Sequence, residues 1–232
     1  MVYVLILLLI AVGLVGQIKP DLSFTELAAA YADDHSHFFK WKGINVHYKD
    51  VGNGLPMIFL HGSSSSLHTW DKLAGHLKDG YRVIRMDLPG FGLTGPHPQQ
   101  EYSVVAYEEF LSDFIAHLGL DNFILAGNSW GGVLAWYYAA RHPDKVSALI
   151  LIASAGYKMG KVLKKFKVSR SKIERSIFLN TLYRRTIKSD LNEMYANHRL
   201  IDKATINRYY HLMLLKGNRK AFLDFIEKRK FP

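Results

Sequence analysis

The chain has 232 residues, of which 49% are apolar, and a formal net charge of +10. This length and apolar content suffice for one large domain with a real core, which excludes a disordered or fibrous protein. The absence of cysteine excludes disulfide frameworks, cysteine-based zinc sites and a cysteine nucleophile. No HExxH-type spacing is present, and the sequence predicts neither a metal nor a cofactor.

The N-terminal segment, residues 1–18, carries no charged side chain and contains the apolar run Val2–Val15. A helix over it would be roughly 27 Å long, close to the hydrocarbon thickness of a bilayer. No Lys or Arg precedes the run, and Leu14 stands where a signal-peptide cleavage site needs a small residue. A single-pass membrane anchor is therefore favoured over a cleaved signal, which would give a secreted or periplasmic protein, and over a buried helix. Residues 19–36 are then a juxtamembrane stretch with a short helix.

From His37 onward the sequence predicts an α/β core that ends near residue 156. Strands at Phe38–Trp41 and Ile44–Val51 are joined at Lys42-Gly43 as a hairpin. Strands and helices then alternate: strand Met57–Leu60, helix Leu67–Leu77, strand Tyr81–Met86, helix Val104–Leu118, strand Phe123–Ala126, helix Trp130–Arg141 and strand Val146–Ile152. Such alternation predicts a mostly parallel sheet with helices on both faces. Residues 157–232 lack strand signals and are predicted to be helical.

A G-x-S-x-G motif, Gly127-Asn128-Ser129-Trp130-Gly131, lies directly between the strand Phe123–Ala126 and the following helix. This is the context that a nucleophile elbow demands, because small residues beside the serine permit a sharp strand-to-helix turn that exposes its hydroxyl. Ser129 is therefore the candidate nucleophile. The alternative is a glycine-rich helix start with Ser129 as its N-cap.

Two more polar motifs follow predicted strands. His61-Gly62-Ser63 comes after Met57–Leu60; by itself it is also compatible with a polar turn and helix cap. The run Asp87-Leu88-Pro89-Gly90-Phe91-Gly92-Leu93-Thr94-Gly95 contains a formal G-x-G-x-x-G. Dinucleotide binding fails on context, because Pro96-His97-Pro98 cannot open the helix whose N-terminus would hold a pyrophosphate.

In this order and spacing the three motifs resemble the α/β-hydrolase superfamily, in its branch of lidded esterases, lipases and carbon–carbon bond hydrolases. The resemblance is close over residues 37–156 and extends to residues 157–232 only as a helical lid. Haloalkane dehalogenases and epoxide hydrolases share this fold but place an aspartate at the nucleophile position, so Ser129 argues against both.

The resemblance implies the rest of the site. Backbone N–H groups of Ser63 and Trp130 would form the oxyanion hole, with Ser64 as a one-residue alternative to Ser63, and His61 would be structural. Members of the family continue after the lid with strands that deliver the acid and histidine of the triad. Both remain unassigned, and we expect a chain truncated before them. His198 and His211 are the histidines of the lid that would have to act as base instead.

The predicted lid is strongly basic. Residues 157–232 contain 20 Lys and Arg against 6 Asp and Glu, so the rest of the chain is net acidic. The densest run extends from Lys158 to Arg175 and is consistent with a solvated helix face or with contact to anionic lipid. No nucleic-acid module accompanies the charge.

The function expected from these features is serine hydrolysis of a small, apolar carboxylic ester by a membrane-anchored enzyme, inactive as given if the triad is incomplete. The alternatives are cleavage of a carbon–carbon bond in a β-diketone-like substrate, and a non-catalytic membrane-associated binding protein. Reaction with a serine-directed probe separates the catalytic readings from the inert one.

Overall fold

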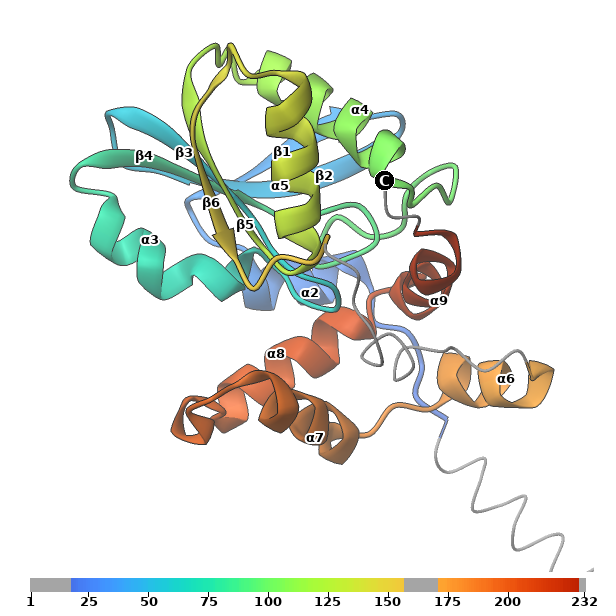
Figure 1. Cartoon of the computed structure of the whole chain (residues 1–232). Coiled ribbons are helices and arrows are strands. Elements are labelled where there is room, and N and C mark those ends of the chain that lie inside the picture. Colours follow the sequence, from blue (N-terminus) through green and yellow to red (C-terminus); the bar gives the residue numbers. More distant parts are fainter. Residues whose placement is uncertain (1–17, 157–170, 230–232) are drawn as a thin grey trace, which may run out of the picture.

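The computed structural model describes residues 18–156 and 171–229. A twisted sheet forms its centre, with helices packed on both faces and at one end (Figure 1). The sheet has 6 strands in the order β1-β2-β4-β3-β5-β6. The strands are β1 (Ser36–Trp41), β2 (Ile44–Val51), β3 (Leu55–Leu60), β4 (Tyr81–Met86), β5 (Phe123–Asn128) and β6 (Val146–Ile152).

Pairing in the sheet is mixed. β3, β4, β5 and β6 run parallel, whereas β2 is antiparallel to both β1 and β4. β1 and β2 form the expected hairpin, with Trp41 opposite Ile44. Its two turn residues, Lys42 and Gly43, have φ of 44° and 91°, the left-handed pair that a tight hairpin turn needs. The α/β core predicted from the sequence is thus confirmed, with a mixed sheet.

Helices cover both faces of this sheet. The helical elements are α2 (Phe24–Tyr31), η1 (Leu67–Trp70), α3 (Asp71–Leu77), α4 (Val104–His117), α5 (Trp130–Arg141), α6 (Lys172–Asn180), α7 (Arg184–Met194), η3 (His198–Leu200), α8 (Lys203–Met213) and α9 (Asn218–Lys228). Along β3, Ile58 and Leu60 face the core under α4 and α5, while Met57 and Phe59 face Trp70 on the opposite side. Because strand side chains alternate, the continuous apolar run of β3 is buried on both faces.

The C-terminal helices, α6 to α9, lie beyond the carboxyl ends of the parallel strands (Figure 1). α9 is the one that enters the main core, because Ala221 and Phe225 belong to the same apolar cluster as α4 and α5. The Phe225 ring lies edge-on to both Phe91 and Trp130, with centroids 5.2 Å apart in each pair. Burying a phenylalanine contributes about 2 kcal/mol, so α9 is anchored beside the strand ends that carry the sequence motifs.

The prediction of a transmembrane helix, and with it the membrane-anchored localisation, is wrong for the chain that the structure describes: none of its helices is long and apolar enough to cross a bilayer. Residues 1–17, which suggested the anchor, lie outside the described part. The stretch expected to be juxtamembrane packs on the protein instead. Leu22 donates its N–H to the Leu214 carbonyl at 2.7 Å, and Leu27 of α2 is buried against Leu212 and Leu215. Hydropathy alone misled here, because it measures composition and not what a segment contacts.

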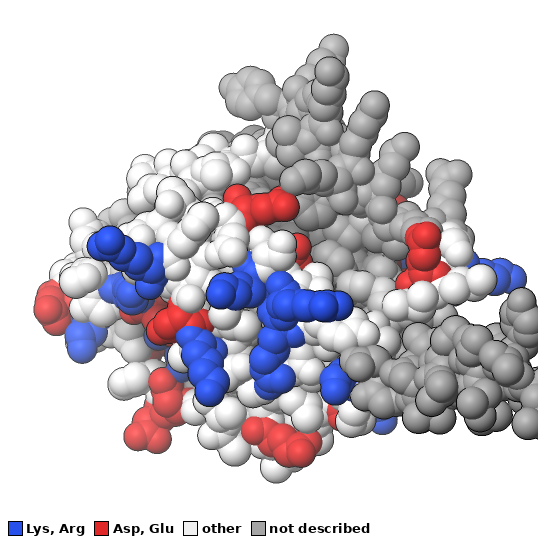
Figure 2. Space-filling model, turned by 90° about the horizontal axis from the view of Figure 1, so that it is seen from below, with Lys and Arg blue, Asp and Glu red and all other residues white. Residues whose placement is uncertain are grey.

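Charge on the C-terminal helices is mixed. Figure 2 looks at the molecule from below and shows Lys and Arg side chains in the middle of that face, with Asp and Glu groups around them. Most of the dense basic run that the sequence analysis singled out, residues 157–170, lies outside the described residues. The described face therefore resembles an ordinary solvated surface.

Candidate active site

Ser129 stands at the sharp turn between β5 and α5. Its backbone has φ 51° and ψ −113°, a conformation that side chains with a Cβ rarely adopt and that costs of order 1–3 kcal/mol. Such strain persists only where the surrounding structure enforces it. The Ser129 N–H donates to the Ile152 carbonyl at 3.0 Å, which ties the turn to the neighbouring strand.

The glycines of the motif permit this turn by close approach. A Cβ added to Gly127 would lie 2.2 Å from the Gly131 carbonyl oxygen, and one added to Gly131 would lie 2.3 Å from the Leu60 carbonyl oxygen. Both distances are shorter than any tolerated contact. The spacing of G-x-S-x-G is therefore required for α5 to start against the ends of β3 and β5.

The loop after β3 lies against the Ser129 side chain. Parallel pairing sets Leu60 beside Gly127, so the residues that follow the two strands emerge together. A Cβ added to Gly62 would lie 3.1 Å from the Ser129 Cβ. Ser63 comes next in this loop, and Trp130 is the first residue of α5, where a helix directs its N–H groups outward. The loop that contains Ser63 therefore passes beside Ser129, and Trp130 follows Ser129 directly in the chain.

His61, expected to be structural, is fully buried and uses both ring nitrogens. The Leu88 N–H donates to its Nε2 at 3.0 Å, so Nδ1 carries the proton and donates to the Gly62 carbonyl at 2.8 Å. Burial lowers the pKa of His61 despite the nearby Asp87 carboxylate. The ring is therefore neutral and joins the loop after β3 to the loop after β4.

Asp87, at the end of β4, organises the glycine-rich run. Its carboxylate accepts from the Leu67 N–H at 2.8 Å and from the Leu93 N–H at 2.9 Å. A Cβ added to Gly92 would lie 2.1 Å from the Asp87 carboxyl carbon, which explains the glycine there. Burial raises the pKa of Asp87, but hydrogen bonds from His47 and the Leu67 N–H outweigh it and lower the pKa to about 2. The glycine-rich run is therefore a folded turn. This agrees with the sequence analysis, which rejected dinucleotide binding for it.

The sequence analysis missed His47, which supports Asp87 from β2. Its Nδ1 lies 2.8 Å from Asp87 Oδ2 and its Nε2 lies 2.9 Å from Ser36 Oγ. Nδ1 donates to the carboxylate, and Nε2 shares a hydrogen bond with the Ser36 hydroxyl, so both ring nitrogens are engaged. The only local signal was a histidine on the face of β2 opposite Val46 and Tyr48.

A general base for Ser129 is not found in the described part of the chain, where its hydroxyl makes no hydrogen bond. The two candidate histidines of the C-terminal helices are engaged elsewhere. His198 Nε2 donates to the Asn192 carbonyl at 3.0 Å. His211 lies between the Tyr31 hydroxyl, 2.8 Å from Nδ1, and Arg184, 3.1 Å from Nε2. Burial and the Arg184 charge both lower the pKa of His211.

A small cavity lies between the strand-end loops and the C-terminal helices. Its volume is about 10 Å³, close to the least that one water molecule needs. α8 supplies Tyr209, Leu212 and Met213 to its wall, and the loops supply Ser64–Ser66 and Gly90–Gly92. The C-terminal helices therefore close over the loops that follow β3 and β4. Among residues 18–156 and 171–229, no group of His, Asp and Glu side chains is arranged to hold a metal ion.

Sequence comparison finds relatives among known hydrolases. Epoxide hydrolase 2 of Siraitia grosvenorii is 36% identical over 110 residues, which are 47% of this chain and 35% of that protein. The chain thus spans about a third of the length of this relative and of epoxide hydrolase 3 of Xenopus tropicalis, which it also matches.

Solved structures extend the likeness to the C-terminal helices. Cfl2 from Burkholderia cenocepacia superposes with a TM-score of 0.74 at 22% identity, over 82% of this chain and 69% of that one. A serine hydrolase involved in carbazole degradation superposes with a TM-score of 0.68 at 27% identity, over 83% of this chain and 69% of that one. The family model of the alpha/beta hydrolase fold matches residues 56–215, more than half of the chain. The chain belongs to the α/β-hydrolase fold family.

Proposed function

We propose that this protein is a serine hydrolase acting on carboxylic esters, with Ser129 as its nucleophile. The observation that carries the proposal is the strained backbone of Ser129, φ 51° and ψ −113°, held at a strand end with an unbonded hydroxyl. Stored strain of this kind clusters at functional sites. An N-cap serine would instead have an extended backbone and accept a bond from its helix, and no such cap bond is found at α5.

The oxyanion hole would consist of the backbone N–H groups of Ser63 and Trp130. Attack by Ser129 Oγ on an ester carbonyl moves the π electrons onto the oxygen, which needs two donors fixed before the reaction. Gly62 packs against the Ser129 Cβ, so the Ser63 donor and the nucleophile are held in one rigid arrangement. Trp130, at the start of α5, adds the positive end of the helix dipole.

The reaction would proceed through an acyl-enzyme. Ser129 Oγ bonds to the carbonyl carbon, its proton passes to a base, and collapse of the tetrahedral adduct expels the alcohol, which takes the proton. Water then attacks the acyl carbon and releases the acid and the free serine. The base lies outside the described residues or is supplied by solution, because no described histidine contacts Ser129.

Serine chemistry favours an ester over the epoxides named for the plant relative. A carboxylate that opens an epoxide forms an ester, and water can hydrolyse that ester at its carbonyl. A serine hydroxyl that opened the same ring would form an ether, which offers water no carbonyl to attack. Turnover at Ser129 therefore requires a substrate that already contains an acyl carbon.

The C-terminal helices would act as a lid over the substrate. Apolar side chains, Phe91, Leu212 and Met213, line the cavity between lid and loops together with serine hydroxyls. This lining favours an apolar acyl or alcohol group. Likeness to the serine hydrolase involved in carbazole degradation, 27% identical, supports the serine mechanism.

A fluorophosphonate probe tests the proposal, because it forms a stable adduct only with an activated serine. The full chain is incubated with the probe, with and without added imidazole as an external base, and the adduct is located by peptide mass spectrometry. We expect labelling of Ser129 that is absent from Ser129→Ala and unchanged in Ser147→Ala, which removes an exposed hydroxyl on β6. Labelling that needs imidazole would mean that nucleophile and hole are built and the base comes from elsewhere.

A folded wild-type protein that stays unlabelled with imidazole present would contradict the proposal and favour a non-catalytic binding role. Folding is checked by a cooperative urea transition. Initial rates on p-nitrophenyl esters of two to eight carbons then define the preferred acyl length, with Ser129→Ala as the blank.

A further inference from the structure

One side chain of the lid reaches the loop that follows β3. The Tyr209 hydroxyl on α8 lies 3.0 Å from Ser65 Oγ, and Ser65 Oγ lies 2.5 Å from Thr69 Oγ1 in η1. Tyr209 is half-buried and also lines the cavity above the loop. The contact joins residues 144 positions apart, so it exists only when the C-terminal helices are seated.

Ser65 is the last residue of a tight turn. Its N–H donates to the Gly62 carbonyl at 3.3 Å, which encloses Ser63 and Ser64 as the two central residues. Ser64 has φ 61°, a left-handed value that favours glycine over serine. A turn with a long closing bond and a strained third residue is not stable by itself. The two hydroxyls on Ser65, from Thr69 and Tyr209, anchor its end.

We propose that Tyr209 is a positioning residue: through Ser65 it fixes the turn that holds the Ser63 N–H, so that lid closure and completion of the oxyanion hole are one event. The proposal rests on the function proposed above. Tyr209 itself touches no reacting atom. Its part is to select the loop conformation in which the Ser63 donor faces the oxygen above Ser129.

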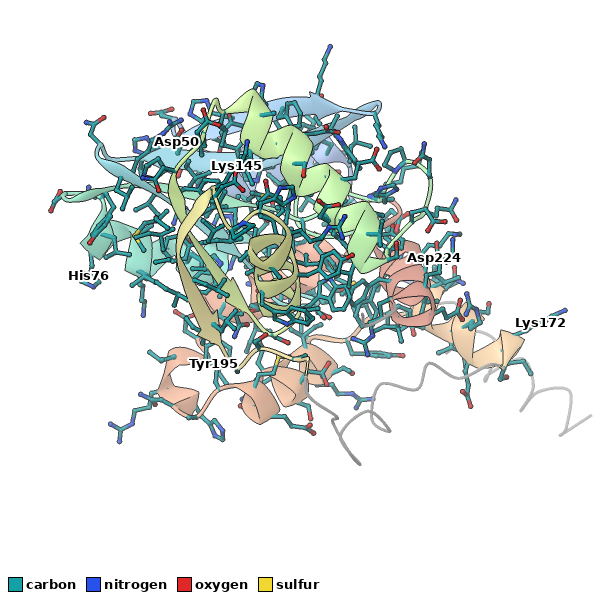
Figure 3. All side chains as sticks on the ribbon, turned by 45° about the horizontal axis from the view of Figure 1, so that its top comes forward. Asp50, His76, Lys145, Lys172, Tyr195 and Asp224 are labelled. Atoms are coloured by element: carbon teal, nitrogen blue, oxygen red, sulfur yellow. The ribbon has the colours of Figure 1, made fainter. Side chains whose placement is uncertain are left out.

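Support for Tyr209 comes from the lid behind it. Tyr195, which follows α7 and lies on the lid side of the sheet (Figure 3), hydrogen-bonds with Tyr209. Burial and this neighbour raise the pKa of Tyr195 to about 12. The Tyr195 hydroxyl therefore stays protonated at neutral pH, and a chain of hydroxyls runs from Tyr195 through Tyr209 and Ser65 to Thr69.

The contact depends on the position of α8. With Tyr209 on Ser65 the cavity between loop and lid is about 10 Å³, room for about one water molecule. Ser129 is not among the residues that line this cavity. A movement of α8 away from the loop would break the bond to Ser65 and release the turn, so an open lid would carry an incomplete site.

Removing the Tyr209 hydroxyl tests this role. The inactivation of Ser129 by the fluorophosphonate is measured over a range of probe concentrations, with imidazole present, for wild type, Tyr209→Phe and Tyr210→Phe. We expect Tyr209→Phe to lower the saturating inactivation rate constant about fivefold to tenfold, with the half-saturating concentration and melting temperature unchanged. Tyr210 is the matched control, because it is the next residue of α8 and its ring packs on Arg184; its variant should change the rate less than twofold.

A double-mutant cycle shows whether the effect passes through Ser65. Ser65→Ala should lower the rate as Tyr209→Phe does, and the double variant should be no slower than the slower single one. Multiplying losses, or an unchanged rate in Tyr209→Phe, would overturn the proposal. Hydrogen exchange of the peptide over residues 62–66 should be faster in Tyr209→Phe than in Tyr210→Phe.

The exchange measurement needs no catalysis, so it separates the two proposals. If wild type is never labelled but Tyr209→Phe loosens the loop, the serine hydrolase assignment fails and the positioning contact stands. If wild type is labelled and the loop is equally protected in both variants, Tyr209 is only a packing residue.

Discussion

Asp87 and Ser129 follow strands β4 and β5, on either side of β3, and they are built in opposite ways. Asp87 is fully buried, and its carboxylate accepts bonds from His47, Leu67 and Leu93. Ser129 is half-exposed, its hydroxyl is bonded to no described residue, and its backbone is strained. The first polar group is fully satisfied and joins β2, η1 and the glycine-rich turn, whereas the second has no hydrogen-bond partner among the described residues. Among the residues that follow these strands, a fully bonded carboxylate indicates a structural role, whereas an unbonded hydroxyl on a strained backbone is what the proposed nucleophile requires.

Loss of the Asp87 charge should give the largest effect on stability. In Asp87→Asn the amide presents hydrogens where the Leu67 or Leu93 N–H needs an acceptor, so buried donors become unpaired. We expect a loss of about 3 kcal/mol in the free energy of unfolding, measured by urea denaturation.

Asp50→Asn is the matched control for that variant. Asp50 pairs with Arg82 at 2.6 Å but is partly exposed, so its substitution should cost under about 1 kcal/mol. Equal losses in the two variants would mean that the Asp87 cluster is no more than a surface ion pair, and the contrast with Ser129 would disappear.

Low pH should remove the stabilisation by Asp87 without a mutation, because it protonates the carboxylate. The pKa of Asp87 is lowered from 3.8 to about 2 in the folded protein, so the unfolded chain binds the proton more readily. The stabilisation is complete above pH 4 and is lost as the pH falls to about 2. It amounts to about 2 kcal/mol. Urea midpoints at pH 5 and pH 2.5 measure it, and the part due to Asp87 is the drop that is missing in Asp87→Asn.

Whether a feature of the fold or the site could be predicted from the sequence depends on how far apart its residues lie in the chain. The elbow at Ser129, the hairpin at Lys42-Gly43 and the turn after Asp87 are set by residues within a few positions, so their patterns predicted them. The pairing of His47 with Asp87 and of Tyr209 with Ser65 spans 40 and 144 positions. No local pattern marks such contacts, because they arise only when the sheet and helices assemble.

The N-terminal segment shows the same limit. Hydropathy of residues 1–18 predicted a membrane anchor, with a short helix in the juxtamembrane stretch after it. The short helix is present as α2, and Ser23 and Glu26 form a reciprocal capping box at its start. Its surroundings differ from those expected, since α2 packs on α8 through Leu27 and Leu212. Local chemistry predicted the helix and gave no information about what it would contact.

The smallest expected effect is also the most direct test of strain at Ser129. With φ 51° and ψ −113°, the position favours glycine, so Ser129→Gly should be more stable than Ser129→Ala by about 1 kcal/mol. At Ser147, in the regular strand β6, the order should reverse, because glycine there only adds freedom to the unfolded chain. Neither Ser129 variant can react with the probe. A Ser129→Gly protein more stable than Ser129→Ala would show that the turn destabilises the fold when its residue carries a Cβ, as serine does. If glycine and alanine rank alike at both positions in urea denaturation, the turn at Ser129 is relaxed, and the strain argument for its function fails.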